Sequence, residues 1–224
     1  SSFGLYTWMN NPESQMVAVT VRAGSKAEMA LPDGTFVHLN AATNLEYDVN
    51  NSKQRLVKLS GEAFFDVAKN PDCPFKVIIN DLQIEVVGTS FNVKTYKKAI
   101  LETSLLSGRI RISGGSLPHE YTLSPGQKAT YSAMDRTLRI SKADAHVEAG
   151  WRDNYLIFES TPLIDVIAQI ERWYGVEIRL HHKQIAQDLL SGSFRNESIQ
   201  NVIRSLSIQY GFKYEIHKDI ITIY

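Results

Sequence analysis

FESTPLIDVIAQIERWYGVEIRLH, residues 158–181, and FRNESIQNVIRSLSIQYGFKYEIH, residues 194–217, are two copies of one unit. They align without a gap at an offset of 36 residues. The matched positions are Phe158 with Phe194, Leu163 with Ile199, Val166-Ile167 with Val202-Ile203, Ile170 with Leu206, Tyr174-Gly175 with Tyr210-Gly211, and His181 with His217. Because nearly all of them are apolar or are glycines that suit a helix end, the repeat preserves a packing pattern and no set of reactive groups. It favours a duplicated binding module over a catalytic one.

Each copy predicts a strand, a helix and a second strand. In the first copy Tyr155–Phe158 is a short strand, Thr161 is the N-cap and Pro162 the first helical residue, and Gly175 ends the helix before a strand at 176–180. The second copy repeats this order, with strands at 190–194 and 212–216 and a further strand at 220–224. Two such βαβ copies can close one core that neither could close alone.

The chain upstream of the repeat predicts an all-β region from about Met16 to Lys142. Val17, Val19 and Val21 alternate with other residues, as in a half-buried strand, and no helical apolar period follows. Further strands are expected at 36–39, 55–59, 62–67, 75–79, 82–87, 91–96, 100–106, 109–113, 120–123, 128–132 and 137–141. Both a twisted stack of β-turns and a β-sandwich fit this pattern.

The fold class is therefore mainly β followed by α+β, in three segments. Residues 1–15 form a segment near a membrane, residues 16–148 the all-β domain, and residues 149–224 the duplicated βαβ domain, because the pattern changes near Gly150. The chain begins at Ser1 without methionine, which indicates a fragment or a mature form. The apolar stretch Phe3–Met9 fits either the trimmed end of a membrane helix or an apolar terminus.

Composition excludes several classes of protein. The 24 Lys and Arg residues balance the 24 Asp and Glu residues, so no overall field attracts nucleic acid or anionic lipid. The single cysteine, Cys73, cannot form an intrachain disulfide. No run of 18 apolar residues exists that could span a membrane.

The sequence offers little chemistry for catalysis. Glu62 and Asp66 lie on one face of a predicted strand, about 13 Å apart, which is too far for a glycosidase pair. The six histidines lack the spacing of a metal-binding helix, although the repeat could bring His181 and His217 near one another. We expect no enzymatic activity, no cofactor and no metal.

A series of sequence blocks from about Ala23 to Tyr224 resembles the FecR-type anti-sigma factors, most closely their Bacteroidetes branch. The blocks are Leu31–Thr35 with Leu39-Asn40 and Tyr47; Arg55, Val57 and Leu59 with Gly61–Val67; Val87–Val93; Leu106–Gly108; Leu123–Gln127; Trp151–Phe158; and Arg172–Tyr174. Each block is weak alone, but their order and spacing are specific. Asn154 departs from the family pattern, which usually has glycine there.

This resemblance implies a role in cell-surface signalling. Such proteins hold an extracytoplasmic-function sigma factor with a cytoplasmic segment and cross the inner membrane once, and both parts are absent from this chain. The periplasmic part receives a signal from a TonB-dependent outer-membrane transducer. The C-terminal module resembles the short N-terminal domain of secretins and such transducers. We expect a periplasmic monomer that binds no nucleic acid.

Exposed sheet edges are the expected contact site, because an unpaired edge is a template for strand addition. One candidate is the strand around Leu190 and Phe194, and the other is the final strand with Ile220, Thr222 and Tyr224. The alternative function is a carbohydrate-binding β-rich periplasmic module.

Overall fold

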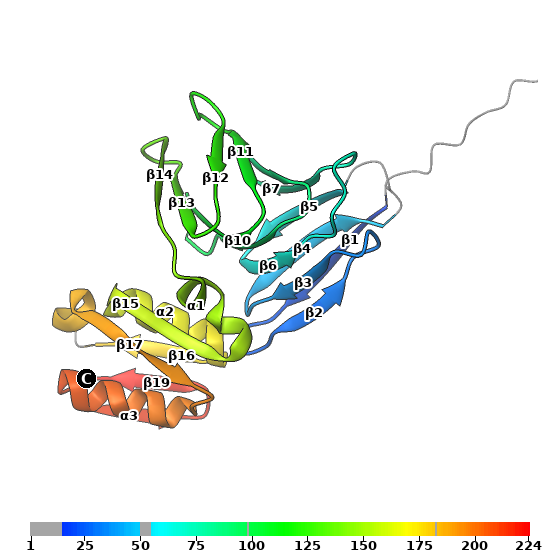
Figure 1. Ribbon diagram of the computed structural model, residues 1–224. Coiled ribbons are helices and arrows are strands. Elements are labelled where there is room, and N and C mark those ends of the chain that lie inside the picture. Colours follow the sequence, from blue (N-terminus) through cyan, green and yellow to red (C-terminus); the bar gives the residue numbers. More distant parts are fainter. Residues whose placement is uncertain (1–14, 50–54, 98, 182) are drawn as a thin grey trace, which may run out of the picture.

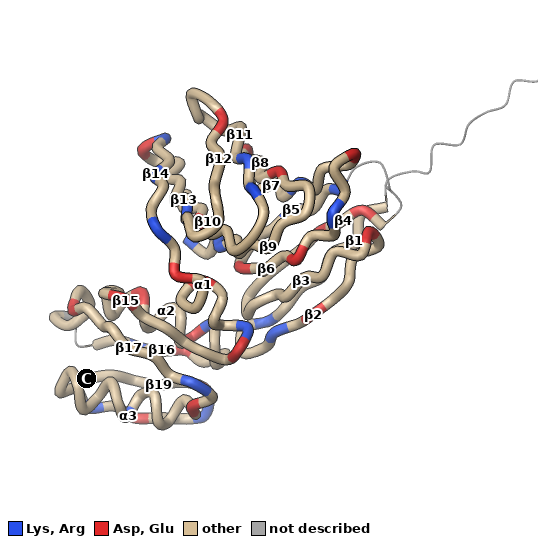
Figure 2. The backbone as a smooth tube through the Cα atoms, in the orientation of Figure 1, with Lys and Arg blue, Asp and Glu red and all other residues tan. Residues whose placement is uncertain are grey.

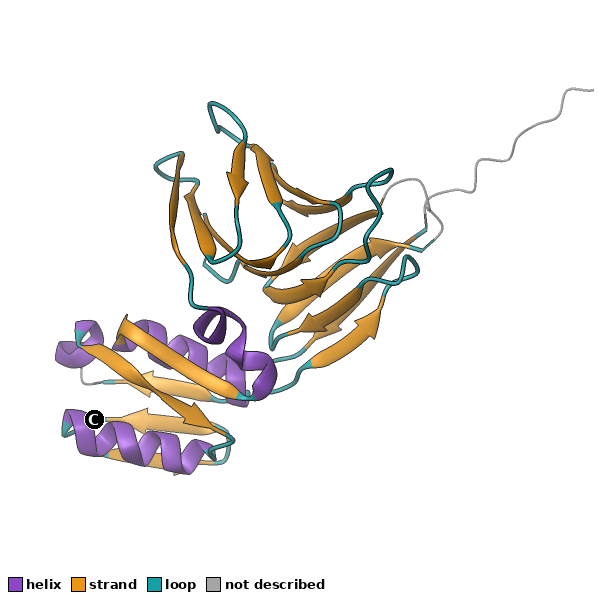
Figure 3. Cartoon of the chain, in the orientation of Figure 1, coloured by secondary structure: helices purple, strands orange, loops and turns teal. Residues whose placement is uncertain are grey.

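The computed structural model describes residues 15–49, 55–97, 99–181 and 183–224 (Figure 1). The expected membrane-near segment 1–15 lies outside these ranges except for Gln15. The chain forms a β domain (residues 16–142), a short helical junction segment (residues 143–154) and a C-terminal module (residues 155–224) (Figures 1 and 3).

The β domain is built from two seven-stranded sheets. The first has the order β1 (Met16–Val21), β4 (Thr43–Asp48), β5 (Arg55–Ser60), β7 (Phe75–Ile79), β8 (Leu82–Val86), β11 (Ile110–Gly114) and β12 (Tyr121–Leu123). The second has the order β14 (Thr137–Lys142), β13 (Gln127–Ser132), β10 (Ile100–Ser107), β9 (Ser90–Lys94), β6 (Glu62–Asp66), β3 (Phe36–Leu39) and β2 (Ala27–Ala30). All neighbours are antiparallel except β5 and β7.

Both sheets contribute to one apolar core, so the β domain is a sandwich. Leu45, Val57 and Val77 enter this core from the first sheet, and Phe65 and Phe91 enter it from the second. The last two rings stack with their centroids 5.2 Å apart. Alternation of buried and more exposed residues along strands such as β5 and β7 places one face inward, whereas β6 and β9 are buried on both faces.

Two strands and one helix of the structure were not predicted from the sequence. Strand β2 has the sequence AEMA and β4 has TNLEYD, and neither is rich in β-branched residues. They are strands because β2 pairs with β3 and β4 lies between β1 and β5. The junction segment contains helix α1 (Ala145–Ala149) and the 3-10 helix η1 (Gly150–Asp153). Asp144 caps α1 by accepting a hydrogen bond from the His146 amide.

The C-terminal module confirms the duplicated βαβ plan. Its elements are β15 (Tyr155–Pro162), α2 (Leu163–Tyr174), β16 (Glu177–Leu180), the 3-10 helix η2 (Lys183–Gln187), β17 (Leu189–Arg195), α3 (Ile199–Tyr210), β18 (Tyr214–His217) and β19 (Ile220–Ile223). Both helices have 12 residues. Gly175 and Gly211 end them in the left-handed conformation, with φ values of 69° and 72°.

The module has one core, which lies between its two small sheets and both helices. Strands β15 and β17 form a two-stranded sheet, and β16, β19 and β18 form a three-stranded sheet in that order. Leu156 from the first sheet, Ile221 from the second, and the helical residues Ile170 and Leu206 share this core. The two repeat copies thus close one hydrophobic interior, as predicted.

The start of α2 differs from the sequence prediction. Strand β15 continues to Pro162, and Pro162 is the N-cap without a side-chain capping bond, whereas Thr161 was the predicted N-cap. The reason is tertiary pairing, because Thr161 and Pro162 pair with Leu190 and Leu189 of β17 beyond a bulge.

The final strand was predicted to be a free edge, and this prediction was wrong. Strand β19, with Ile220 and Thr222, is the middle strand of its sheet, parallel to β16 and antiparallel to β18. Tyr224 exchanges main-chain hydrogen bonds with Lys213. The parallel pairing joins residues that are far apart in the sequence, and the local apolar pattern does not show it.

Candidate partner-binding site

Strand β17 presents an unpaired edge. Its described neighbour in the sheet is β15 alone, and Ser191, Gly192 and Ser193 are exposed. The segment Leu189–Phe194 has neither a charged residue nor a proline, and the one charged residue of β17, Arg195, lies at its end with its guanidinium 4.7 Å from the centroid of the Tyr155 ring of β15.

The main-chain groups of β17 alternate in direction. The Asn196 amide donates to Asn154 O, and Asp188 O accepts from the Leu163 amide, so the even-numbered residues face β15. Because successive residues of an antiparallel strand point their N–H groups to opposite sides, residues 191, 193 and 195 direct theirs to the free edge. Leu189 faces the same side, but its carbonyl already accepts a hydrogen bond from the Tyr210 hydroxyl at 3.1 Å. The open part of the edge therefore offers three outward N–H donors, at residues 191, 193 and 195.

The other edge strands of the module are less open. Strand β16 carries an exposed ion pair between Arg179 and Glu177 at 2.7 Å. Strand β18 carries Glu215, whose carboxylate accepts from the Tyr224 hydroxyl at 3.3 Å. Strand β15 is bulged between Phe158 and Thr161, and Ser160 within the bulge has a φ of 45°. Charges and bulges of this kind discourage strand addition.

A second feature joins the module to the β domain at the end of α2. The Gly24 amide, in the loop between β1 and β2, donates to Arg172 O at 2.8 Å. The Lys26 ammonium donates to Trp151 O at 2.6 Å and to Asn154 Oδ1 at 3.0 Å. It also lies 3.7 Å from the centroid of the Trp173 ring. We call the set Gly24, Lys26, Arg172, Trp173 and Gly175 the clasp.

Burial and nearby charges shift the pKa values of groups in and beside the clasp. Desolvation lowers the pKa of Lys26 to about 8, although the nearby Glu62 carboxylate raises it. The Arg172 guanidinium lies 4.2 Å from the centroid of the Tyr96 ring. Burial first, and then Glu62, raise the pKa of Tyr96, so its hydroxyl stays protonated and donates to Ala41 O at 2.5 Å.

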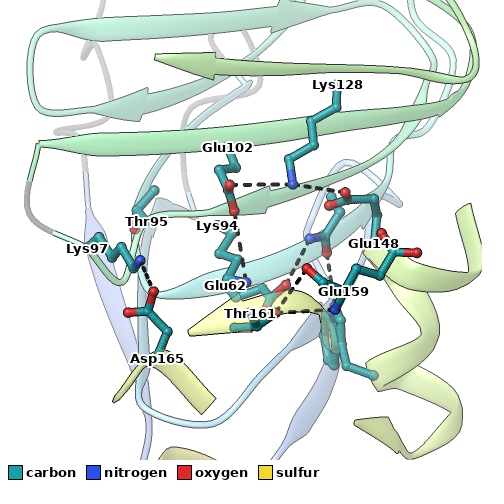
Figure 4. A network of polar contacts seen from close by, with 12 residues as sticks. Glu62, Lys94, Thr95, Lys97, Glu102, Lys128, Glu148, Glu159, Thr161 and Asp165 are labelled. Atoms are coloured by element: carbon teal, nitrogen blue, oxygen red, sulfur yellow. Dashed lines mark hydrogen bonds and ion pairs between the residues drawn. The ribbon is translucent and has the colours of Figure 1, made fainter. Parts of the chain in front are cut away.

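A buried polar network surrounds Glu62, which Figure 4 labels. The Glu62 carboxylate accepts from the Asn40 amide at 2.8 Å and from the Asn92 amide at 3.0 Å. Asn92 Oδ1 accepts from the Trp151 indole at 3.1 Å. Since Trp151 belongs to the junction segment, the chain leading to the module is hydrogen-bonded to strand β9. Phe64 and Ala149 complete a small apolar cluster around Trp151.

Ion pairs surround a cleft of about 640 Å³ that is lined by residues of the β domain, the junction segment and the module. Figure 4 shows these ion pairs, and Figure 2 colours the charged residues along the backbone. Lys97 contacts Asp165 of α2 at 2.7 Å. Lys128 contacts Glu148 at 2.9 Å and Glu102 at 3.4 Å. Although burial lowers the pKa of Lys128, these two carboxylates raise it above its usual value.

Comparison with known proteins identifies the family. A model described as "FecR protein" matches residues 17–111, and one described as "FecR, C-terminal" matches residues 155–223. A crystal structure of a protein assigned as an anti-sigma factor in Parabacteroides distasonis is 30% identical, with a TM-score of 0.84 over 94% of this chain and 99% of that chain. The chain belongs to the FecR family of anti-sigma factors. A second crystal structure from the same organism and with the same assignment is 30% identical, with a TM-score of 0.83 over 93% and 98% of the two chains. No curated protein matches.

The blocks that suggested the FecR family meet at the junction. Asn40, Glu62, Asn92 and Trp151 come from four different blocks and form the single buried network described above. Asn154, the departure from the family pattern, adopts a φ of 61° and accepts from Lys26. No local pattern in the sequence predicts that these four residues meet.

The predicted contact residues of this FecR-family chain lie in different environments. Leu190 is buried and Phe194 is half-buried, so β17 offers its main chain rather than these side chains to a partner. Ile220 and Thr222 are in the middle of a sheet, and Tyr224 stacks on His181 with centroids 5.8 Å apart. Partner binding at any of these positions stays a prediction.

The residues considered for chemistry are not brought together as a reactive site. Glu62 belongs to the buried network, whereas exposed Asp66 accepts from the Ser90 hydroxyl at 2.8 Å. His181 and His217 lie near opposite ends of β19, so the repeat does not bring them together. Among the described residues no group of three or more His, Cys, Asp and Glu side chains could hold a metal ion. In the described ranges no helix has the length and apolar composition to cross a bilayer.

Proposed function

We propose that this FecR-family chain is the periplasmic, signal-receiving part of an anti-sigma factor anchored in the inner membrane. In this proposal it relays ligand occupancy of a TonB-dependent outer-membrane transducer. The recipient is an extracytoplasmic-function sigma factor, held by a cytoplasmic segment that lies outside this chain. Membership of the FecR family supports the regulatory role.

The free edge of β17 is the observation that carries the proposed contact. It has three outward N–H donors and an uncharged segment at Leu189–Phe194. An extended strand from the transducer's small periplasmic domain would pair with these groups and continue the two-stranded sheet. Main-chain pairing would supply affinity, and the exposed residues beside the edge would supply selectivity.

Ser193→Pro tests this contact with a matched control, Ser193→Ala. Proline removes the outward N–H of residue 193 without removing a bond to β15, since residue 193 faces the free edge. The measurement is affinity for the purified signalling domain of the transducer that this chain captures from the same organism. We expect the proline variant to bind at least tenfold more weakly and the alanine variant to bind normally. Equal binding by both folded variants would exclude the β17 edge.

The carbohydrate-binding alternative gains no support from the cleft. Its aromatic residues already have partners, because Arg172 covers Tyr96, and Tyr155 contacts both His146 and Arg195. Trp151 is 6% exposed and its indole is hydrogen-bonded. A sugar-binding platform needs open aromatic faces, so protein recognition is the better reading of this surface.

A further inference from the structure

The two repeat copies provide an internal comparison for the clasp. Gly175 and Gly211 occupy matched positions and share the left-handed conformation. A Cβ atom on Gly175 would lie 3.1 Å from Ala23 O in the β domain, whereas a Cβ on Gly211 would meet nothing within 4 Å. The βαβ fold therefore needs a glycine at both helix ends, but only the first one also packs against another domain.

Sequence differences between the copies follow the same division. Arg172-Trp173 of the first copy corresponds to Ile208-Gln209 of the second. Arg172 and Trp173 contact the β domain, whereas Ile208 is 75% exposed. At this position of the repeat, only the first copy uses its side chains for a contact with the β domain.

The contact is small compared with the domains that it joins. The β domain and the module have separate hydrophobic cores. The apolar cluster at their junction has three buried residues, Phe64, Ala149 and Trp151, and the described part of the module adds only the half-buried Trp173 to it, together with the Asp165 ion pair to Lys97. Gly24 and Gly175 of the clasp are exposed at the rim, and Lys26 is exposed as a whole although its ammonium end is partly desolvated. Small and partly polar contacts between domains are the usual sites of relative motion.

Lys26 both stabilises and destabilises the closed form of the clasp. Its ammonium lies over the Trp173 ring of the module, a contact that favours the docked arrangement. Its two hydrogen-bond acceptors, Trp151 O and Asn154 Oδ1, belong to the junction segment, so these bonds fix the segment about which the module would turn. Desolvation nevertheless lowers the pKa of Lys26 to about 8, so keeping the charge there at neutral pH costs free energy. These opposing effects suit a contact that opens and closes.

We infer that the clasp is a releasable latch that holds the C-terminal module in one orientation against the β domain. When it opens, the module turns about the junction segment, and the cleft beside the clasp provides the space for that movement. The regulatory use of the latch rests on the proposed function. A strand bound at β17 would shift the latch only if it binds the open and closed forms with different affinity.

Spin-label distances test the latch in the isolated chain. Labels at Met134→Cys and Ile208→Cys occupy sites that are 84% and 75% exposed, in a Cys73→Ser background. Pulsed electron resonance should give one narrow distance distribution for the parent and for Gly211→Ala. Gly175→Ala should add a broad or second population. Identical distributions for the two alanine variants would overturn the proposal.

If circular dichroism shows that Gly175→Ala is unfolded, a second pair of variants tests the latch. Lys26→Ala removes the ammonium contacts, and Lys142→Ala changes an exposed lysine of β14. The first should broaden the distance distribution and the second should not, and equal distributions would contradict the latch. No partner is present in either experiment. A negative result for the latch therefore does not contradict the proposed contact at β17. Loss of transducer binding likewise does not contradict the latch.

Discussion

The Trp151 indole donates to Asn92 Oδ1 at 3.1 Å, and the amide of the same asparagine donates to the Glu62 carboxylate at 3.0 Å. Asn92 is therefore a bridge between the junction segment and the interior of the β domain. It is 2% exposed, so water cannot easily replace either bond.

Asn92→Ala should destabilise the protein strongly. It leaves a buried carboxylate and a buried indole N–H each short of a partner, which should lower the free energy of unfolding by about 2–4 kcal/mol. Urea unfolding measures the effect. Asn201→Ala, on the exposed face of α3, is the control and should change little. Equal losses for both variants would show that the buried bridge is unimportant.

Arg55→Met should remove a buried anchor of the first sheet. The guanidinium donates to Cys73 O, Ala68 O and Asn70 O and pairs with Asp33 at 3.2 Å. Losing these bonds while Asp33 keeps its charge should cost about 3–5 kcal/mol in thermal or urea unfolding. Arg179→Met, which removes a solvent-exposed ion pair, should leave the unfolding midpoint where it is.

The two helices should contribute alike to the core of the module. Ile170 and Leu206 are matched by the repeat and are 0% and 1% exposed. Replacing either by alanine should cost about 2–5 kcal/mol. Ile208→Ala, at a residue 75% exposed, should change stability by less than about 0.5 kcal/mol. A large loss from one matched variant and none from the other would mean that the copies do not share one core.

Lys26 predicts a pH dependence of stability with a definite sign. Its pKa is about 8 in the folded chain, below the ordinary 10.5, so between these values the unfolded chain binds more protons. The free energy of unfolding should therefore gain a contribution as pH rises from about 8 toward 10.5. Lys26→Met should lack that contribution. Parallel urea curves at pH 7.5, 9 and 10 measure the difference, and identical pH slopes would refute it.

The sequence predicted those parts of the fold that depend on local pattern. Apolar spacing around Ile170 and Leu206, with Gly175 and Gly211 behind them, was enough for two helices and one shared core. The pattern did not show that β19 lies between β16 and β18, because a parallel pairing depends on packing after the helices are placed.

The candidate site was predictable only in part. The repeat predicts the strand that became β17, and in the structure this strand lies at the edge of its two-stranded sheet. The clasp joins Gly24 and Lys26, in the loop between β1 and β2, to Arg172 and Trp173 near the end of α2, residues that are far apart in the sequence. The spacing of apolar residues along the sequence does not indicate such a contact. The one sequence signal was the difference between Arg172-Trp173 and Ile208-Gln209.

Hydrogen exchange at β17 tests the central claim most directly. Amide exchange of the full chain would be followed with and without the transducer's purified signalling domain. Strand addition predicts that the amides of residues 191, 193 and 195 become strongly protected, while those of 190, 192 and 194, already paired with β15, change much less. Binding that protects β16, β18 or the β domain and leaves the odd-numbered β17 amides unchanged would contradict the account.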